Sequence, residues 1–311
     1  MIKVDPKGLK KPLYISHSGL TDWRRCEARW YFKHQLQLQL DESRPPLEYG
    51  AALHRAMPYV QRGMLDTAHL TFRESWKGSG CEEDEKRNLL NASKMLENWN
   101  STRVEMNNIP YEIIEPPTAE KLMLNDQYSD QEFGFVVELN ETGIPFVGRI
   151  DAVARSKDTK KIWGVEYKTT SELAQRFMNA WDINSQILSY ATVLEVMFPE
   201  EDVEGFYLEA IRVSRTEPKN LCIPIFVSPH QMEQFISLYN QTCEQILNAL
   251  DKGEFVQDIT ACTCYNQFGQ PGYKCEFTML CKETPEDWTK YLPAYTQRKK
   301  SPFRVVMEES K

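Results

Sequence analysis

Apolar residues recur at helical spacing through the first third of the chain. Residues 18–34, 48–61 and 83–99 each place apolar side chains three to four positions apart, which predicts three amphipathic helices. A Pro-Pro pair at 45–46 separates the first helix from the second. We therefore expect this part of the chain to be largely helical.

The period of the pattern changes to two from residue 132 onward. Residues 132–137, 144–155 and 161–170 are separated by turn sequences and predict three consecutive strands of a β meander. The next predicted elements are a helix at 181–196, strands at 205–213 and 221–227, and a helix at 230–250. This order predicts an α/β fold in which a mixed β-sheet is flanked by helices.

Length and charge narrow the class of protein. The chain has 311 residues, enough for one large domain or two ordinary ones. Its net charge of -8 argues against nonspecific coating of nucleic acid, although an enzyme with a local basic groove fits. No apolar run has the length of a signal peptide or a membrane span, so we expect a cytosolic protein without a membrane partner.

Charged residues interrupt two otherwise apolar strands. Asp151 lies in IPFVGRIDAVA, while Glu166 and Lys168 lie in IWGVEYK, two positions apart and so on one face. A hairpin between the strands can place Asp151 beside them. The same pattern is typical of a solvated face with a surface ion pair. The apolar surroundings favour a functional site, because a metal ion would offset the cost of charges at the edge of a core.

Two helices add further polar candidates. Gln186 and Tyr190 are four positions apart and share a helix face, which by itself is typical of an ordinary helix surface. His54 lies on the second predicted helix, where a lone histidine is more often structural than a ligand. Neither signal is specific without the strand residues.

The C-terminal region is rich in cysteine. Four cysteines fall within twenty positions: Cys262, Cys264, Cys275 and Cys281. Their spacing lacks the CxxC pairs of structural zinc modules. Thiolates also hold iron-sulfur clusters, at irregular spacing and usually as four ligands. A zinc site and a group of reduced, buried thiols are the alternatives.

Taken together, the polar motifs resemble those of a known family. In chain order they are Gly50-x3-His54, Gly148-x2-Asp151, Glu166-x-Lys168 and Gln186-x3-Tyr190. This order resembles the PD-(D/E)XK nuclease superfamily, and most of all its RecB-type exonuclease branch. The resemblance implies a mixed α/β nuclease core that hydrolyses DNA.

The resemblance also implies a role for each strand residue. Asp151 and Glu166 would bind a catalytic Mg or Mn ion, His54 would add a ligand, and the Tyr167 carbonyl would complete the site. Lys168 would orient or deprotonate the attacking water. Such an ion makes a nucleophile from water at neutral pH and stabilises the leaving alkoxide, and a lysine beside it adds positive charge.

Three further residues are less firmly placed by the motifs. In the RecB-type branch the positions of Gln186 and Tyr190 support the lysine and the DNA backbone. Glu120, shortly before a predicted strand, is a weaker acidic candidate. A basic and aromatic stretch at residues 23–34 has the composition of a DNA contact, although core packing is the favoured interpretation.

The cysteines match the iron-sulfur subset of the RecB-type nucleases, which includes AddB-like and CRISPR-associated exonucleases. In that subset one cysteine precedes the nuclease core and three follow it. The matching residues here are Cys26, Cys264, Cys275 and Cys281, and Cys262 competes with Cys264. The resemblance thus implies a 4Fe-4S cluster, with zinc as the alternative metal. Its implied role is structural, because ligation requires the folded chain.

These inferences lead to one expected organisation. The predicted parts are an N-terminal helical region at 1–46, a nuclease core at 47–258 with a helical insertion at about 60–115, an iron-sulfur segment at 259–290 and a tail at 291–311. We expect a metal-dependent DNA exonuclease of recombination, repair or phage-type DNA metabolism, in a bacterial or phage-infected cell, with helicase or recombination proteins as partners. The alternatives are a DNA-binding iron-sulfur or zinc protein with an inactive nuclease-like core, and a zinc-stabilised interaction module.

Overall fold

The chain divides into two compact units in the structure, a computed structural model. Residues 1–40, 45–77, 79–80, 82, 84–114, 132–139, 141–181, 183–265 and 271–298 are described, with the backbone alone for Arg176, 263–265 and 271–273. Unit 1 comprises Met1–Glu42, Val136–Gly148 and Glu233–Lys311, and unit 2 comprises Ser43–Phe135 and Arg149–Met232. The predicted mixed α/β class is confirmed.

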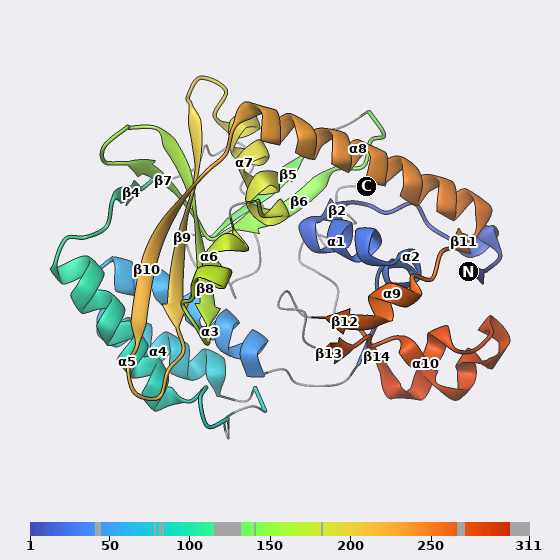
Figure 1. The fold of residues 1–311 in the computed structure, drawn as a ribbon, viewed down its shortest axis with the longest axis horizontal. Helices are drawn as coiled ribbons and strands as arrows, with labels where there is room; N and C mark the ends of the chain where they lie inside the picture. The colour runs from blue at the N-terminus through green and yellow to red at the C-terminus, as the bar shows by residue number, and fades with distance from the viewer. Residues whose placement is uncertain are drawn as a thin grey trace. The chain divides into compact units, whose positions relative to one another are not determined.

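Unit 2 is built on a five-stranded mixed sheet (Figure 1). Its strands lie in the order β10 (Lys219–Phe226), β9 (Val203–Arg212), β8 (Ile162–Thr170), β7 (Ala152–Ser156) and β4 (Tyr111–Ile113). Only β8 and β9 run parallel; the other neighbours are antiparallel. A parallel pair requires a crossover connection. Helices α6 (Gln175–Asn179) and α7 (Ser185–Met197) lie in that connection.

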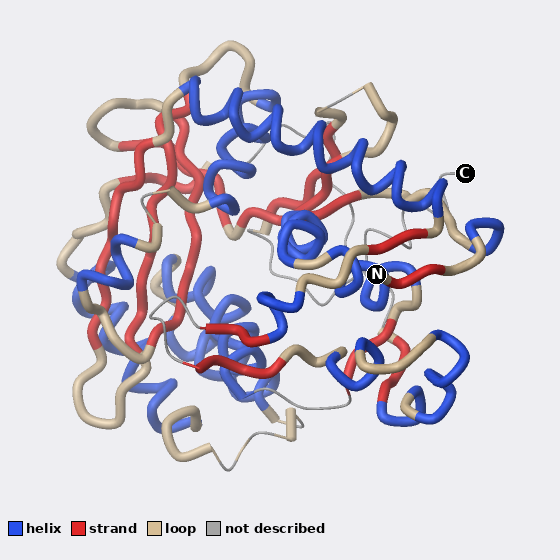
Figure 2. The backbone as a smooth tube through the Cα atoms, turned by 45° about the vertical axis from the view of Figure 1, so that its right-hand side comes forward, coloured by secondary structure: helices blue, strands red, loops and turns tan. Residues whose placement is uncertain are grey.

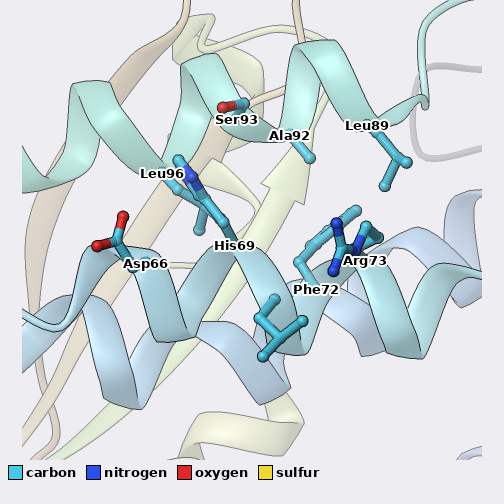
Figure 3. Close-up of a pocket in the computed structure, with 9 residues that line it drawn as sticks. Asp66, His69, Phe72, Arg73, Leu89, Ala92, Ser93 and Leu96 are labelled. Atoms are coloured by element: carbon cyan, nitrogen blue, oxygen red, sulfur yellow. The ribbon is translucent and has the colours of Figure 1, made fainter.

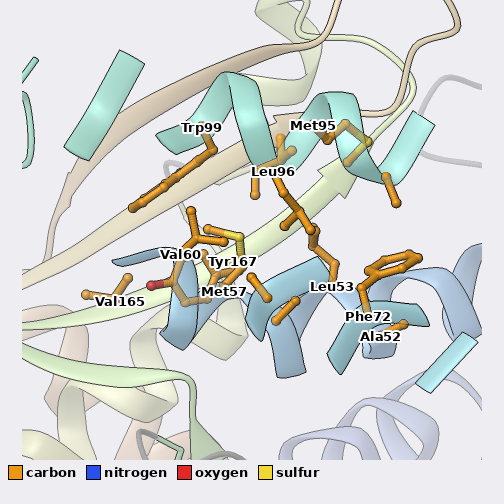
Figure 4. Close-up of a cluster of buried hydrophobic side chains, with 14 of the residues drawn as sticks. Ala52, Leu53, Met57, Val60, Phe72, Met95, Leu96, Trp99, Val165 and Tyr167 are labelled. Atoms are coloured by element: carbon orange, nitrogen blue, oxygen red, sulfur yellow. The ribbon is translucent and has the colours of Figure 1, made fainter. Parts of the chain in front are cut away.

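Helices before the sheet supply the apolar core of unit 2. They are α3 (Pro45–Gln61), α4 (Leu65–Trp76), α5 (Leu89–Trp99) and the π-helical turn η3 (Asn100–Glu105). Figure 4 shows side chains such as Leu53, Met57 and Trp99 packed around Val165 and Tyr167 of β8. Because strand side chains alternate, the residues between these two on β8 leave by the other face of the sheet.

Close packing explains the glycine at position 164 of β8. Gly164 of β8 lies under the ring of Phe206 on β9, and a Cβ built at this position would be 2.1 Å from two ring carbons. No side chain fits there without moving the ring. The position therefore requires glycine for packing.

Unit 1 combines a long helix with short sheets and turns (Figure 2). Its helices are α1 (His17–Arg25), α2 (Glu27–Trp30), the π-helical turn η2 (Tyr31–Gln35), α8 (Pro229–Lys252), α9 (Ile259–Cys262) and α10 (Thr278–Cys281), with short turns η1 (Pro6–Gly8), η5 (Pro285–Lys290) and η6 (Leu292–Ala294). None of the helices in the described ranges has both the length and the apolar composition that a membrane crossing requires.

Short strand pairs join distant parts of unit 1. The pairs are β1 (Ile2–Lys3) with β11 (Glu254–Phe255), β2 (Ile15–Ser16) with β6 (Phe146–Ile150), β3 (Leu38–Leu40) with β14 (Tyr295–Gln297), and β12 (Thr263–Tyr265) with β13 (Pro271–Lys274). Strand β5 (Phe133–Val137) completes a three-stranded sheet with β6 and β2. The pairs β1–β11 and β3–β14 bring segments more than 200 residues apart into one unit.

The first predicted helix, at 18–34, is wrong as a continuous element. Cys26 has an extended backbone (φ -171°, ψ 119°) and separates α1 from α2. Hydrogen bonds that the helix would lose are replaced: Ala28 N donates to Val256 O at 3.0 Å, and Glu27 accepts from Val256 N at 2.8 Å. Pairing with residue 256 thus overrides the helical pattern.

The predicted three-strand meander is also wrong. The segment 144–155 forms two strands, β6 and β7, in different sheets, with Asp151 at the break. Likewise the helix predicted at 83–99 begins at Leu89, because Asn88 caps it and Asp84 accepts from the N–H groups of Lys86 and Arg87.

The remaining predicted elements are confirmed within a few residues. They are the helices now labelled α3, α7 and α8 and the strands β8, β9 and β10. Helix α7 starts at Ser185 because Asn184 accepts hydrogen bonds from the N–H groups of Gln186 and Ile187. α4, which has no separate prediction, lies within the expected helical insertion.

Candidate active site

Asp151 lies where the chain leaves β6 and enters β7. Strand β7 pairs with β8 so that Ala152 faces Val165, which brings the residue before Ala152 next to the charged part of β8. The Oδ2 atom of Asp151 accepts a hydrogen bond of 2.8 Å from the main-chain N–H of Tyr167. The β7–β8 hairpin therefore places Asp151 as its sequence position suggests.

Glu166 and Lys168 occupy the face of β8 that points away from the helical core. Glu166 is 2 % exposed, and its carboxylate forms an ion pair with Lys168. Its Oε1 atom also accepts from Gln186 Nε2 at 2.9 Å. Among the described residues, its Oε2 atom is buried without a hydrogen-bond partner. A buried carboxylate oxygen without a partner is costly, and a bound cation would remove that cost.

Helix α3 contributes His54 to the same group. The Nδ1 atom of His54 lies 3.1 Å from Asp151 Oδ1, and its ring meets the Tyr167 ring edge to face at 6.2 Å. One turn earlier, a Cβ at Gly50 would lie 3.6 Å from Thr169 Oγ1, which is an ordinary contact. Packing therefore does not require glycine at position 50.

Helix α7 adds Gln186 and Tyr190, one turn apart. Gln186 contacts the carboxylate of Glu166, as above, and so reaches Lys168 only through that carboxylate. Tyr190 is 8 % exposed and packs edge to face against Phe135, with ring centres 5.6 Å apart. Both side chains thus lie against the inner, buried side of the site.

The two carboxyl groups of the site differ in their affinity for protons. Burial alone would raise the pKa of Asp151, but the charge and hydrogen bond of His54 and the charge of Lys168 lower it. Burial raises the pKa of Glu166, and the neighbouring carboxylate of Asp151 raises it further, against the opposing effect of Lys168. Glu166 is therefore the carboxylate whose ionised form gains most from an added cation.

Neighbouring carboxylates favour the charged forms of the two basic groups of the site. Burial disfavours the charge on Lys168, yet the carboxylates of Glu166 and Asp151 raise its pKa. Burial likewise disfavours the charge on His54, and Asp151 raises the pKa of His54 by its charge and hydrogen bond. A protonated lysine can donate hydrogen bonds and supply positive charge, but it cannot accept a proton.

Sequence reasoning misses an ion pair beside Asp151. Arg149 lies two residues before Asp151, and its Nη1 atom is 2.9 Å from Glu132 Oε2. Burial raises the pKa of Glu132, Arg149 opposes that shift, and the charge of Asp151 adds to it. Arg149 is two positions before Asp151 in the sequence, whereas nothing in the sequence singles out Glu132.

Sequence reasoning also misses an aromatic neighbour of the lysine. The Nζ atom of Lys168 lies 5.7 Å from the ring centre of Trp181, within the range of a cation–π contact. Trp181 belongs to the connection between β8 and α7 and is partly exposed. It lies within the predicted helix at 181–196, but the observed helix α7 begins at Ser185.

A buried charge network lies on the core side of the same sheet. Glu209 of β9 is fully buried and accepts from Arg103 at 2.8 Å and from the Tyr111 hydroxyl at 3.0 Å. The register of the parallel pair sets Glu209 beside Tyr167. A carboxylate within the apolar strand sequence GFYLEAIRV is the signal that could have identified it.

A hollow in unit 2 lies apart from the predicted site residues. A hollow of about 280 Å³ between α4 and α5 is lined by residues such as Asp66, His69 and Arg73, and includes none of the predicted site residues (Figure 3). Glu120 lies outside the described residues. Across the described part of the chain, no three or more His, Cys, Asp or Glu side chains are already placed as ligands of one metal ion.

The cysteines of unit 1 gather around one small hollow. Cys26, Cys262, Cys275 and Cys281 all line it. Burial, followed by a hydrogen bond from Gln257 that opposes it, sets the pKa of Cys281 at about 12, with the other three thiols adding to the rise. The side chain of the predicted ligand Cys264 lies outside the described residues. The choice between Cys262 and Cys264 as the fourth ligand therefore stays a prediction.

The basic and aromatic stretch at residues 23–34 is part of the core of unit 1. Its aromatic side chains Trp23, Trp30, Tyr31 and Phe32 are all buried. Its basic side chains Arg29, Lys33 and His34 surround the buried carboxylate of Asp22 at 2.8 to 3.0 Å. The favoured core interpretation is confirmed for these residues.

Glu166 and Lys168 share one face of β8, Asp151 lies beside them, and helices α3 and α7 add His54 and Gln186. This arrangement is typical of a nuclease fold. The model of the PD-(D/E)XK nuclease superfamily matches residues 14–282. The chain therefore belongs to this superfamily. Its nucleases act on nucleic acid and generally use a divalent metal.

The similar chains among solved structures include two of low sequence identity. A candidate exonuclease from Eubacterium rectale is 14 % identical, with 88 % of this chain and 94 % of that chain covered and a TM-score of 0.47. The protein SSO0001 is 13 % identical, with 64 % and 74 % covered and a TM-score of 0.27. No curated protein matches the chain.

Proposed function

We propose that this protein is a divalent-metal-dependent DNA nuclease that acts as an exonuclease on single strands or ends. One observation carries the proposal: four segments far apart in sequence converge on the charged end of β8. His54 contacts Asp151, Asp151 contacts the Tyr167 main chain, and Glu166 contacts both Lys168 and Gln186. Chance surface charges do not assemble in this buried, mutually bonded way.

The donor set fits a hard divalent cation. Asp151, Glu166, His54 and the Tyr167 carbonyl would hold Mg or Mn, and the unpartnered Oε2 of Glu166 supports this fit. When bound, the ion would neutralise phosphate oxygens and lower the pKa of a coordinated water. The opposite pKa shifts of the two carboxyl groups further support a site that lacks one positive charge.

The residues around the carboxylates have separate tasks in this proposal. Lys168, held charged by Glu166 and Asp151, would donate to the water or to a phosphate oxygen, and so orients the water rather than deprotonating it. Gln186 would fix the Glu166 carboxylate in place. Tyr190 would close the buried side of the site, and Arg149 lies near enough in the chain to assist with phosphate charge.

The test is a cleavage assay on the full chain. End-labelled single strands, blunt duplexes and closed circles are incubated with Mg, Mn or EDTA. We expect metal-dependent loss of the linear substrates, with circles intact, and no cleavage by Lys168→Ala. Cleavage of circles would change the mode to endonuclease, and a lack of metal-dependent cleavage on every substrate would refute the nuclease function.

We also propose that unit 1 holds a 4Fe-4S cluster as a structural cofactor, on Cys26, Cys275, Cys281 and either Cys262 or Cys264. The support is that four soft donors line one hollow. Four thiolates on a single zinc lie about 3.8 Å apart, since each Zn–S bond is about 2.3 Å. In a cubane each thiolate binds a different iron, so its four ligands are spread more widely than those of a single zinc.

Metal analysis tests the cluster and its fourth ligand. Protein purified without oxygen should be brown and contain about four iron and four sulfide per chain. Cys262→Ala and Cys264→Ala form a matched pair, and the one that loses iron identifies the ligand. Stoichiometric zinc without sulfide would overturn the cluster and leave the nuclease proposal standing.

A further inference from the structure

Trp181 differs from every other tryptophan of the chain. All seven tryptophans lie in the described ranges, and six of them are buried: Trp23, Trp30, Trp76, Trp99, Trp163 and Trp288. Trp181 alone is partly exposed. Part of its indole surface is therefore open to a ligand, whereas the other six indoles are packed inside the protein.

Trp181 lies beside the lysine of the proposed active site. Its ring centre is 5.7 Å from Lys168 Nζ. Lys168 already has an ion-pair partner in Glu166, so the indole is not needed to compensate its charge. The indole ring is therefore close to any phosphate group that Lys168 contacts.

The surroundings of Trp181 are apolar and open. Phe177 of α6 lies beside it, with ring centres 6.1 Å apart and an interplanar angle of 56°. Ile183 is 78 % exposed. The connection between β8 and α7 therefore presents a short apolar surface next to a strongly charged site, a combination that suits a ligand with both a phosphate and a flat ring.

We propose that Trp181 stacks on an unpaired nucleobase of the nucleotide whose phosphate Lys168 contacts. The inference rests on the proposed nuclease function and deepens it by specifying the substrate. Every base has a π face, so stacking tolerates all sequences. A base inside a duplex is already stacked on both sides and paired, so the contact selects single strands and frayed ends over intact duplex.

The experiment combines protein variants with substrates that lack one base. Wild type, Trp181→Ala and Trp181→Phe are compared on single-stranded DNA and on the same strand with an abasic site scanned through the positions next to the cleaved bond. Phe226→Ala is the matched control, because Phe226 is also an exposed aromatic residue of unit 2, on β10 (64 % exposed). Circular dichroism melting confirms that each variant is folded.

The expected result is weaker binding of DNA, and only where the stacked nucleobase is present. Trp181→Ala should raise KM on single strands about 10- to 100-fold with little change in kcat, while Trp181→Phe and Phe226→Ala stay close to wild type. At one abasic position the wild type should lose the same factor, and Trp181→Ala should lose nothing further.

Other results would overturn the contact. An unchanged KM for Trp181→Ala on single strands would do so. A fall in kcat alone, equal on intact and abasic strands, would make Trp181 a positioning residue for Lys168 and would also reject stacking. If wild type leaves all DNA uncut, the nuclease function fails separately, and fluorescence anisotropy with the same strands still measures whether Trp181 binds the base.

Discussion

The acidic site of unit 2 and the cysteine hollow of unit 1 are built in different ways. In the acidic site, neighbouring strands and helices bring side chains into direct contact through hydrogen bonds and an ion pair. Among the described residues of this site, Glu166 Oε2 is the buried carboxylate oxygen without a partner. In the hollow, thiols from opposite ends of the sequence face one another without bonding, and the chain shows no disulfide among the described cysteines. The first is organised by the fold itself, whereas the second would depend on the proposed cluster to join its members.

This difference predicts opposite responses to mutation. A residue of the preorganised site can be removed without unfolding the chain, because the β-sheet and the apolar core hold the backbone. A cysteine of the hollow contributes mainly through what it binds, and ligation that requires the folded chain adds directly to stability. Substitutions in the acidic site of unit 2 should therefore act mainly on activity. Substitutions of the cysteines in unit 1 should act mainly on stability.

The largest expected effect is on activity in unit 2. Lys168→Ala should lower kcat about a thousand-fold, because it removes a charge that acts on the reacting phosphate. The chain should still fold, since the core face of β8 is untouched, but the melting temperature should fall because the buried carboxylate of Glu166 loses its ion-pair partner. Asp151→Ala and Glu166→Ala should behave alike, and steady-state cleavage kinetics together with thermal melting measure both quantities.

Lys219→Ala is the control for this series. Lys219 lies on β10 of the same sheet and forms an exposed ion pair with Glu217. Its removal should change neither activity nor melting. Normal cleavage by any of the three site variants would remove that residue from the proposed mechanism.

The next effect is on stability in unit 1. Cys275→Ala should lose iron and sulfide, unfold at lower temperature and aggregate, because the join between Cys26 and the later cysteines is lost. The matched control is Cys222→Ala, a half-buried thiol on β10 of unit 2. Iron retained at wild-type content in Cys275→Ala would show that this thiol is not a ligand.

The sequence is sufficient to predict the sheet residues of the site but not their partners. Strand alternation, which is a local rule, predicts Glu166 and Lys168. A hairpin, the simplest connection of two adjacent strands, predicts Asp151. Glu132, Trp181 and Glu209 were not found, because their roles arise from contacts between elements that no local pattern encodes. Tertiary contacts place these residues, and their sequence neighbourhoods look ordinary.

The errors in the fold have a similar origin. Helical periodicity runs through Cys26 without a break, yet hydrogen bonds to residue 256 interrupt the helix. The strand pattern likewise runs through Asp151, where the chain changes from one sheet to another. At both positions a long-range contact overrides the local preference, and both positions carry a residue of a proposed site.

A third prediction concerns the buried Asp22 in unit 1. Burial alone would raise its pKa, but hydrogen bonds and charges from His34, Lys33 and Arg29 lower it well below the usual range. A lowered folded-state pKa contributes stability that is fully present above the unfolded-state value of about 4 and is lost as the pH falls through the folded-state value. Asp22→Asn should therefore be less stable than wild type by about 3 kcal/mol at pH 7.

Urea unfolding at pH 7, 5 and 3 measures this dependence. The gap between wild type and Asp22→Asn should stay constant from pH 7 to pH 5 and begin to narrow only below about pH 4. The control is Asp287→Asn, whose carboxylate pairs with Lys290 at the surface of the same unit. Equal stability of Asp22→Asn and wild type at pH 7 would show that the cluster around Asp22 is not a net stabiliser.

The smallest effect separates a supporting ligand from the essential charges of unit 2. His54→Ala removes the imidazole at 3.1 Å from Asp151 but leaves both carboxylates and Lys168 in place. Cleavage in Mg should fall about 10- to 100-fold, as expected when one partner of a metal ligand is lost. Mn should restore part of the loss, because it binds such sites more tightly than Mg and accepts the remaining oxygen ligands. His69→Ala, on α4 and away from these residues, is the matched control. Wild-type cleavage by His54→Ala across a full Mg titration would leave the contact with Asp151 as a structural one. It would restrict the preorganised site to Asp151 and the residues of β8 and α7.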